Sequence, residues 1–127
     1  NRWSAKKEVW VKPSERPGFT GEVTLLTSYE TVSAGESFTM ALMGRSPQVK
    51  RLGERTLGAF SDILPRILPN GWLLGLPNER YLDAEGKSYD GVGIRPDIQI
   101  NVSQESAQQG RDNVVDAALK LLNESER

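Results

Sequence analysis

The sequence of 127 residues contains no histidine and no cysteine. Without cysteine, disulfide bonds and thiolate metal ligands are excluded, although the absence leaves the cellular compartment open. Histidine is the commonest general base near neutral pH, so its absence excludes a self-contained Ser-His catalytic arrangement. Any hydrolytic site on this chain is therefore predicted to be incomplete or differently built.

An excess of charge of one sign and a long hydrophobic run are also missing. The 16 basic and 17 acidic residues are interspersed and give a formal net charge of −1, which argues against nucleic acid or an anionic membrane as a partner. No run approaches the roughly 20 apolar residues of a membrane span, and no basic-then-apolar leader precedes Asn1. The length predicts a single domain over residues 1–127, and the opening residues read as the middle of a longer sequence.

A strand, a turn and a helix are predicted in the first third of the chain. Residues 23–27 form a short apolar and partly β-branched run, which suits a strand buried on both faces. Residues 33–36 supply a helix start signal, and apolar side chains then recur at helical spacing up to Gly44. Ser33 is therefore expected to follow a buried strand and to open a helix.

The later pattern predicts a hairpin, another helix and several short strands. Residues 63–76 surround the turn signal Pro69-Asn70-Gly71 and favour a β-hairpin, in which Pro65 indicates an edge or a bulge. Asp112 is a suitable cap for a helix whose apolar residues form one stripe. Further short strands are predicted at residues 9–11, 49–52, 79–82 and 97–100, with a loop at 56–62.

Ser33 is the main candidate for chemistry, because N–H groups converge at the start of a helix. A nucleophilic serine at this position would have an oxyanion site beside it. The same spacing also fits a capping box, in which Ser33 and Glu36 satisfy each other's backbone donors. Capping boxes are far commoner than catalytic serines, so the spacing alone favours the cap.

Four blocks of sequence carry a resemblance to a known family. They are LLTSYETVSAGE at residues 25–36, LGERTLGA at 52–59, LPNGW at 68–72 and YDGVGIRPD at 89–97. In this order and spacing they resemble the tail-specific, or C-terminal processing, serine proteases over roughly residues 8–102. In that family the nucleophile occupies the position of Ser33.

The resemblance implies an α/β fold of the crotonase or ClpP-like type, of which this chain is the C-terminal half. The expected elements are a mixed sheet, a β-hairpin and two helices. The implied function is a serine-type endopeptidase without cofactor or metal. Its implied partners are protein or peptide substrates and the upstream half of the same protein, with homo-oligomerisation left open. Both exported and cytosolic members are known, and the resemblance favours an extracytoplasmic location.

The way in which the serine is activated divides the family. In the Ser-Lys branch a lysine occupies the position of Ala59, so a lysine dyad is not expected, although Lys50 is near in sequence. The tricorn-like branch, with its Ser-His-Ser-Glu tetrad, is the better match. Its histidine, its second serine and one oxyanion donor come from upstream of the matched residues. The chain alone is therefore predicted to be inactive.

Two further site residues follow from the resemblance. Asp90 stands where the tetrad has its glutamate, and its shorter side chain reduces its reach by one methylene. The alternative for Asp90 is a turn residue before Gly91. The backbone N–H of Ala34, directly after the nucleophile, is implied as one of the two oxyanion donors.

Other side chains have structural explanations. The three tryptophans are predicted to be packing residues, and Ser61 and Asp62 to lie in a turn or at the start of a strand. Glu54 and Asp97 form no metal-ligand pattern. The tryptophans are Trp3, Trp10 and Trp72.

Two other kinds of function remain open. One is a non-catalytic module that binds an apolar ligand on the same fold, as in the retinoid-binding repeats of the eye, and the other is an assembly module.

Overall fold

The computed structural model describes residues 3–12, 14–45 and 47–125, and its strands form two separate sheets. The first is a parallel sheet in the order β1-β2-β5, made of β1 (Thr24–Thr27), β2 (Lys50–Gly53) and β5 (Ile98–Gln99). The second is an antiparallel hairpin of β3 (Ile63–Ile67) and β4 (Leu73–Pro77). The chain therefore has a mixed α/β architecture.

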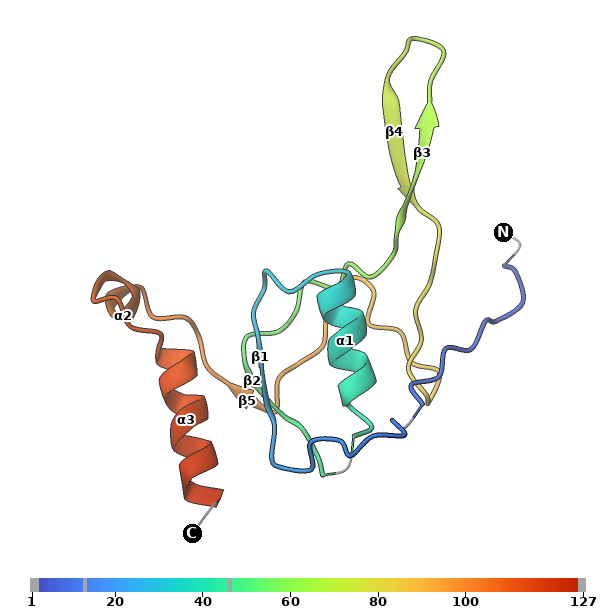
Figure 1. Cartoon of the computed structure of the whole chain (residues 1–127). Coiled ribbons are helices and arrows are strands. Elements are labelled where there is room, and N and C mark those ends of the chain that lie inside the picture. The colour runs from blue at the N-terminus through green and yellow to red at the C-terminus, as the bar shows by residue number, and fades with distance from the viewer. Residues whose placement is uncertain (1–2, 13, 46, 126–127) are drawn as a thin grey trace.

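Three helices accompany these strands: α1 (Ala34–Leu42), α2 (Gln104–Gln108) and α3 (Asn113–Ser125). Asp112 caps α3 as predicted, because its carboxylate accepts hydrogen bonds from the N–H groups of Val114 and Val115. Val114 is buried, and α3 contacts β1 and β2. Figure 1 shows α1 and α3 flanking the parallel strands and the hairpin standing away from them.

The register of the parallel sheet positions Ser33. Thr27, the last residue of β1, pairs with Gly53 at the end of β2, and the Thr27 hydroxyl donates to the carbonyl of Glu54 at 2.7 Å. Because the three strands run in one direction, their carboxyl ends meet at the same edge of the sheet. The connection from β1 to α1, which contains Ser33, leaves from this edge.

A small hydrophobic core lies beside the sheet. Phe60, Tyr89 and Ile94 form its buried centre, and the partly buried side chains of Met40 and Met43, together with Tyr81, pack against it. The centre thus joins the loop after β2, the segment before β5 and the end of α1. Tyr89 and Ile94 belong to the sequence block at residues 89–97, and Phe60 directly follows the block at 52–59.

Several predictions about the elements were wrong. The expected mixed sheet is instead a parallel sheet and a separate hairpin, and the described residues form three helices rather than two. Residues 9–11 and 79–82 form no strand. Within the part of the chain that the structure describes, no strand pairs with residues 9–11, and residues 79–82 follow the hairpin as irregular chain. β1 is not buried on both faces, since Leu26 is 38% exposed.

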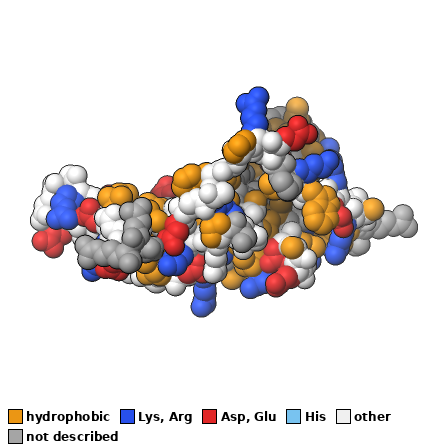
Figure 2. Space-filling view, turned by 60° about the horizontal axis from the view of Figure 1, so that its bottom comes forward, with side chains coloured by type: hydrophobic (Ala, Val, Ile, Leu, Met, Phe, Trp, Pro, Cys, Tyr) orange, Lys and Arg blue, Asp and Glu red, His pale blue; other side chains and the backbone are white. Residues whose placement is uncertain are grey.

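Large hydrophobic side chains reach the surface in many places. Figure 2 shows them on one face of the molecule, with acidic and basic side chains between them. In the hairpin the most exposed are Ile67 (80%), Trp72 (71%) and Leu73 (70%). Within the described residues, no helix combines the length and the apolar character needed to cross a membrane.

Candidate active site

Ser33 lies at the junction of β1 and α1 in a strained backbone conformation. Its φ is 51° and its ψ is −115°, and it is the only residue other than glycine with positive φ in the described part of the chain. Such a conformation costs on the order of 1–3 kcal/mol and persists only where the surroundings hold it. In nucleophile elbows, a sharp strand-to-helix turn of this kind exposes the serine hydroxyl.

Hydrogen bonds to the backbone hold Ser33 in this conformation. Its N–H donates to the carbonyl of Ala59 at 2.9 Å, and its own carbonyl accepts from the N–H groups of Glu36 and Ser37 at 3.0 Å. The hydroxyl makes no capping hydrogen bond. The capping-box interpretation of Ser33 and Glu36 is therefore wrong.

Glu36 has a different role, which sequence reasoning missed. Its fully buried carboxylate accepts hydrogen bonds from the N–H groups of Gly58 and Ala59, both at 2.7 Å. A buried carboxylate is tolerated when such charge-assisted bonds replace its hydration. Because Ala59 in turn accepts from Ser33, Glu36 fixes the loop against which Ser33 is held. No signal in the sequence distinguishes this carboxylate from a helix-start residue.

The Ala34 N–H is available for hydrogen bonding beside the serine. It belongs to the first turn of α1, where N–H groups lack partners within the helix. No residue among 3–12, 14–45 and 47–125 accepts a hydrogen bond from it. A free N–H next to a serine hydroxyl can stabilise an oxyanion that forms on that serine.

The block YDGVGIRPD at residues 89–97, the closing block, is held by hydrogen bonds against the loop that follows β2. Thr56 forms two hydrogen bonds with Ile94: its N–H donates to the Ile94 carbonyl at 3.1 Å, and its hydroxyl accepts from the Ile94 N–H at 2.7 Å. Gly58 accepts from the Gly91 N–H at 2.8 Å. Since Gly58 also donates to Glu36, one residue connects the Ser33 side of the site with the Asp90 side.

Asp90 lies in a turn and is exposed. The carbonyl of Tyr89 accepts hydrogen bonds from the N–H groups of Val92 and Gly93, which closes the turn. The Asp90 carboxylate accepts from the Ser88 hydroxyl at 3.0 Å, and within the described chain it shares no hydrogen bond with Ser33. The structural role that the sequence offered for Asp90 is thus present, and its catalytic role stays a prediction.

Lys50 lies at the other end of the sheet. It begins β2 and pairs with Thr24, whereas Ser33 follows the opposite end of β1. The length of β2 between Lys50 and Gly53 corresponds to roughly 10 Å. A Ser33–Lys50 dyad is therefore not formed.

Two other predictions about side chains differ in outcome. Ser61 and Asp62 directly precede β3, which is the strand-start role that was one of the two expected, and the Ser61 hydroxyl accepts from the N–H groups of Asn78 and Glu79 and donates to the Asp62 carbonyl. The tryptophans were expected to pack, but within the described chain they are exposed. Trp3, Trp10 and Trp72 are 68%, 76% and 71% exposed.

The remaining carboxylates near the site have individual partners. Hydrogen bonds from the Arg51 side chain hold the pKa of Asp97 below its ordinary value. The Lys87 backbone N–H similarly lowers the pKa of Asp83, and burial raises the pKa of the Tyr89 hydroxyl. The described residues contain no group of three histidine, cysteine, aspartate or glutamate side chains that could hold a metal ion.

A scan against protein families relates most of the chain to one of them. The model of Peptidase family S41 matches residues 2–100, which include Ser33, the block at residues 52–59 and the closing block.

Solved structures give the same relationship. A protein from Parabacteroides merdae that is assigned as a peptidase is 32% identical, with a TM-score of 0.79 over 90% of this chain and 36% of its own. The photosystem II D1 C-terminal processing protease is 28% identical, with a TM-score of 0.52 over 63% of this chain and 20% of its own. The tricorn protease, at 21% identity, shares the fold with a TM-score of 0.69 over 97% of this chain and 13% of its own. The chain thus spans about a third of the length of the Parabacteroides protein.

Proposed function

The chain belongs to peptidase family S41, and from this membership we propose that Ser33 is the nucleophile of a serine-type endopeptidase. The observation that carries the proposal is the strained backbone of Ser33 at a strand-to-helix junction, with a free N–H on the next residue. A residue that only capped α1 would need neither the positive φ nor the hydrogen bonds that maintain it.

The proposed reaction is acyl transfer from a peptide bond to Ser33. A general base takes the hydroxyl proton as Oγ attacks the scissile carbonyl carbon, and the Ala34 N–H donates to the resulting oxyanion. The intermediate then expels the amine, which receives the proton from the base, and water later hydrolyses the acyl-enzyme. Asp90 is proposed as the acid that orients the upstream groups.

The general base in this proposal comes from outside the 127 residues, which contain no histidine. We assign the chain to the tricorn-like branch and to the C-terminal half of a crotonase or ClpP-like domain. The second oxyanion donor would also come from the upstream half. Losing one donor typically costs about 100- to 1,000-fold in rate, so the chain alone is expected to be inactive.

A docking role accompanies the catalytic one, and the hairpin favours it. Cross-strand pairs place Ile63, Ile67 and Leu73 on one face of the hairpin and Leu64, Leu74 and Leu76 on the other, so both faces are apolar. An isolated two-stranded hairpin is marginally stable unless further elements cover it. We propose that the upstream part of the same protein packs on this hairpin.

Labelling with a fluorophosphonate, read by intact mass, tests the nucleophile. The full-length protein that contains this chain should gain one label, and its Ser33→Ala variant should gain none. Ser106→Ala, which removes a hydroxyl of α2, serves as the matched control and should keep the label. A folded full-length protein that stays unlabelled would contradict the proposal and favour the non-catalytic module.

A further inference from the structure

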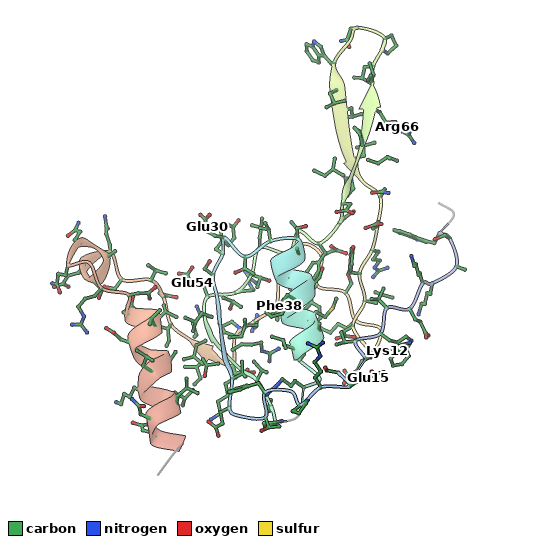
Figure 3. The ribbon with its side chains drawn as sticks, in the orientation of Figure 1. Lys12, Glu15, Glu30, Phe38, Glu54 and Arg66 are labelled. Carbon is green, nitrogen blue, oxygen red and sulfur yellow. The ribbon has the colours of Figure 1, made fainter. Side chains whose placement is uncertain are left out.

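A polar cavity of about 520 Å³ opens at the carboxyl ends of the parallel strands. Glu54 directly follows β2, Gln99 ends β5, and Tyr29 belongs to the connection between β1 and α1. Figure 3 shows Glu54 at the same end of the molecule as Glu30 and the start of α1. Ligands of open parallel sheets characteristically bind outside the carboxyl ends of the strands. The complete lining is Tyr29, Glu54, Arg55, Arg95, Gln99 and Asn101.

The tertiary structure brings the two arginines of this cavity together. Arg55 precedes Thr56 and Arg95 follows Ile94, and the two hydrogen bonds between Thr56 and Ile94 hold these segments side by side. The side chain of Arg55 also passes close to Gly93. Two arginines that lie 40 positions apart in the sequence therefore line one cavity.

Neither arginine is neutralised within the described chain. Arg55 and Arg95 are exposed and form no ion pair there, whereas Arg51 and Arg111 are paired with carboxylates. The lining contains one carboxylate, Glu54, whose oxygens receive only long hydrogen bonds, at 3.5 Å from the Tyr29 N–H and 3.4 Å from the Val102 N–H. The formal charge of the lining is thus positive.

We propose that this cavity binds a carboxylate group of the peptide substrate. Guanidinium groups recognise carboxylates through paired N–H donors, and both arginines of this lining lack an ion pair within the described chain. The amide side chains of Gln99 and Asn101 add polar groups, and they already form a hydrogen bond with each other at 2.9 Å. The cavity adjoins the β1–α1 connection, in which Tyr29 precedes Ser33 by four residues.

This inference rests on the proposed peptidase function and adds a preference to it. The carboxylate can come from an acidic side chain or from the C-terminus of the peptide, since both present the same group. Peptide binding to the full-length protein in its Ser33→Ala form separates these sources, because the peptide is not consumed. Three peptides are compared that differ only at one internal position and at the C-terminus. The first has an internal glutamate and an amidated C-terminus, the second has glutamine and a free C-terminus, and the third has glutamine and an amidated C-terminus.

At least one of the two carboxylate peptides should bind about fivefold more tightly or better than the neutral peptide, and the preference should weaken as salt is added. Which peptide shows the preference identifies the source of the carboxylate. Equal affinity for all three peptides overturns the proposal. Because this comparison changes only the peptide, it needs no variant of the cavity to fold.

Three variants then assign the preference to the cavity. Arg55→Gln and Arg95→Gln should each reduce it, and Glu54→Gln should increase it, since the last change removes the opposing charge. Arg16→Gln is the matched control, because it removes the same charge from the exposed segment before β1. It should leave the preference unchanged. A loss in Arg16→Gln equal to that in the cavity variants would overturn the proposal, because it would indicate general charge attraction.

Failure of this inference is distinguishable from failure of the proposed function. Ser33 labelling without a carboxylate preference would leave a peptidase and remove the cavity from its substrate site. A carboxylate preference that maps to Arg55 and Arg95 in an unlabelled protein would leave a carboxylate-binding module and overturn the assignment to a peptidase substrate.

Discussion

At the scale of single residues, the conformation of Ser33 depends on a carboxylate that takes no part in the proposed chemistry. Glu36 holds the N–H groups of Gly58 and Ala59, and the Ala59 carbonyl holds the N–H of Ser33. Each of these bonds contributes roughly 0.5–3 kcal/mol, enough together to offset a strained residue. The strain is therefore maintained by a loop that is more than 20 residues away in sequence.

Two glycines of the closing block make a matched pair for testing how the block is locked. Gly91 and Gly93 both have positive φ, at 70° and 74°, but a Cβ on Gly93 would overlap the Thr56 carbonyl, whereas a Cβ on Gly91 would meet nothing. Gly91→Ala should reduce the free energy of unfolding by about 1–2 kcal/mol through strain alone. Gly93→Ala should reduce it by more than about 3 kcal/mol, because the backbone of Thr56 must also move.

Chemical denaturation of the two variants in the full-length protein measures this difference. Equal losses would mean that the closing block does not press against Thr56 in the way that its geometry indicates.

At the scale of elements, one ion pair connects the strands of the parallel sheet. Arg51 of β2 donates to both carboxylate oxygens of Asp97, which directly precedes β5, at 2.6 and 3.1 Å. The backbone N–H of Arg51 also donates to this carboxylate at 2.9 Å. Since β5 is short, these bonds supplement a limited ladder between β2 and β5.

The lowered pKa of Asp97 predicts a pH dependence of stability. A carboxylate with a lowered folded-state pKa contributes stability above its unfolded pKa, near 3.9, and loses that contribution as the pH falls through the folded-state value. Asp97→Asn should therefore destabilise the protein at pH 7, by no more than about 1 kcal/mol because the pair is partly exposed.

The difference between wild type and Asp97→Asn should shrink below about pH 4. Urea denaturation at a series of pH values provides the measurement, with the exposed Glu15→Gln as control. A difference that stays constant down to pH 2 would show that Asp97 acts through its shape and not through its charge.

At the scale of the whole molecule, more hydrophobic residues of the described chain are exposed than are buried in its small core. The hairpin is the clearest case, because both of its faces carry hydrophobic side chains and it stands away from the sheet in Figure 1. The chain spans about a third of the length of the Parabacteroides protein. The proposed docking of the upstream part follows from this surface.

A double substitution tests whether the hairpin is covered in the full-length protein. Ile67 and Leu73 are directly opposite each other and are 80% and 70% exposed in this chain. If the upstream part covers them, Ile67→Ser with Leu73→Ser should reduce the free energy of unfolding by about 2 kcal/mol or more. Substitution of two residues that stay exposed would change it by no more than about 1 kcal/mol in total.

Arg66→Ser is the control, since Arg66 lies on the opposite face of the same strand (Figure 3). Thermal denaturation of the full-length variants gives the comparison. A double variant as stable as this control would remove the Ile67–Leu73 face of the hairpin from the proposed interface.

Local pattern in the sequence determined much of what surrounds Ser33. The strand before it, the helix after it, the hairpin around Asn70 and the start of α3 at Asp112 were all predicted, because periodicity and turn residues act over a few positions. The ordered blocks also identified the family, which the match over residues 2–100 confirms. The sequence could not separate a capping role for Ser33 from a catalytic one, because both use the same spacing.

Only the tertiary structure decided which distant groups meet. It paired Glu36 with Gly58 and Ala59, placed Lys50 at the far end of the sheet, and brought Arg55 beside Arg95. It also showed that the parallel strands and the hairpin form separate sheets. The physical reason is that hydrogen-bond partners dozens of residues apart depend on how whole segments pack, which no local period encodes.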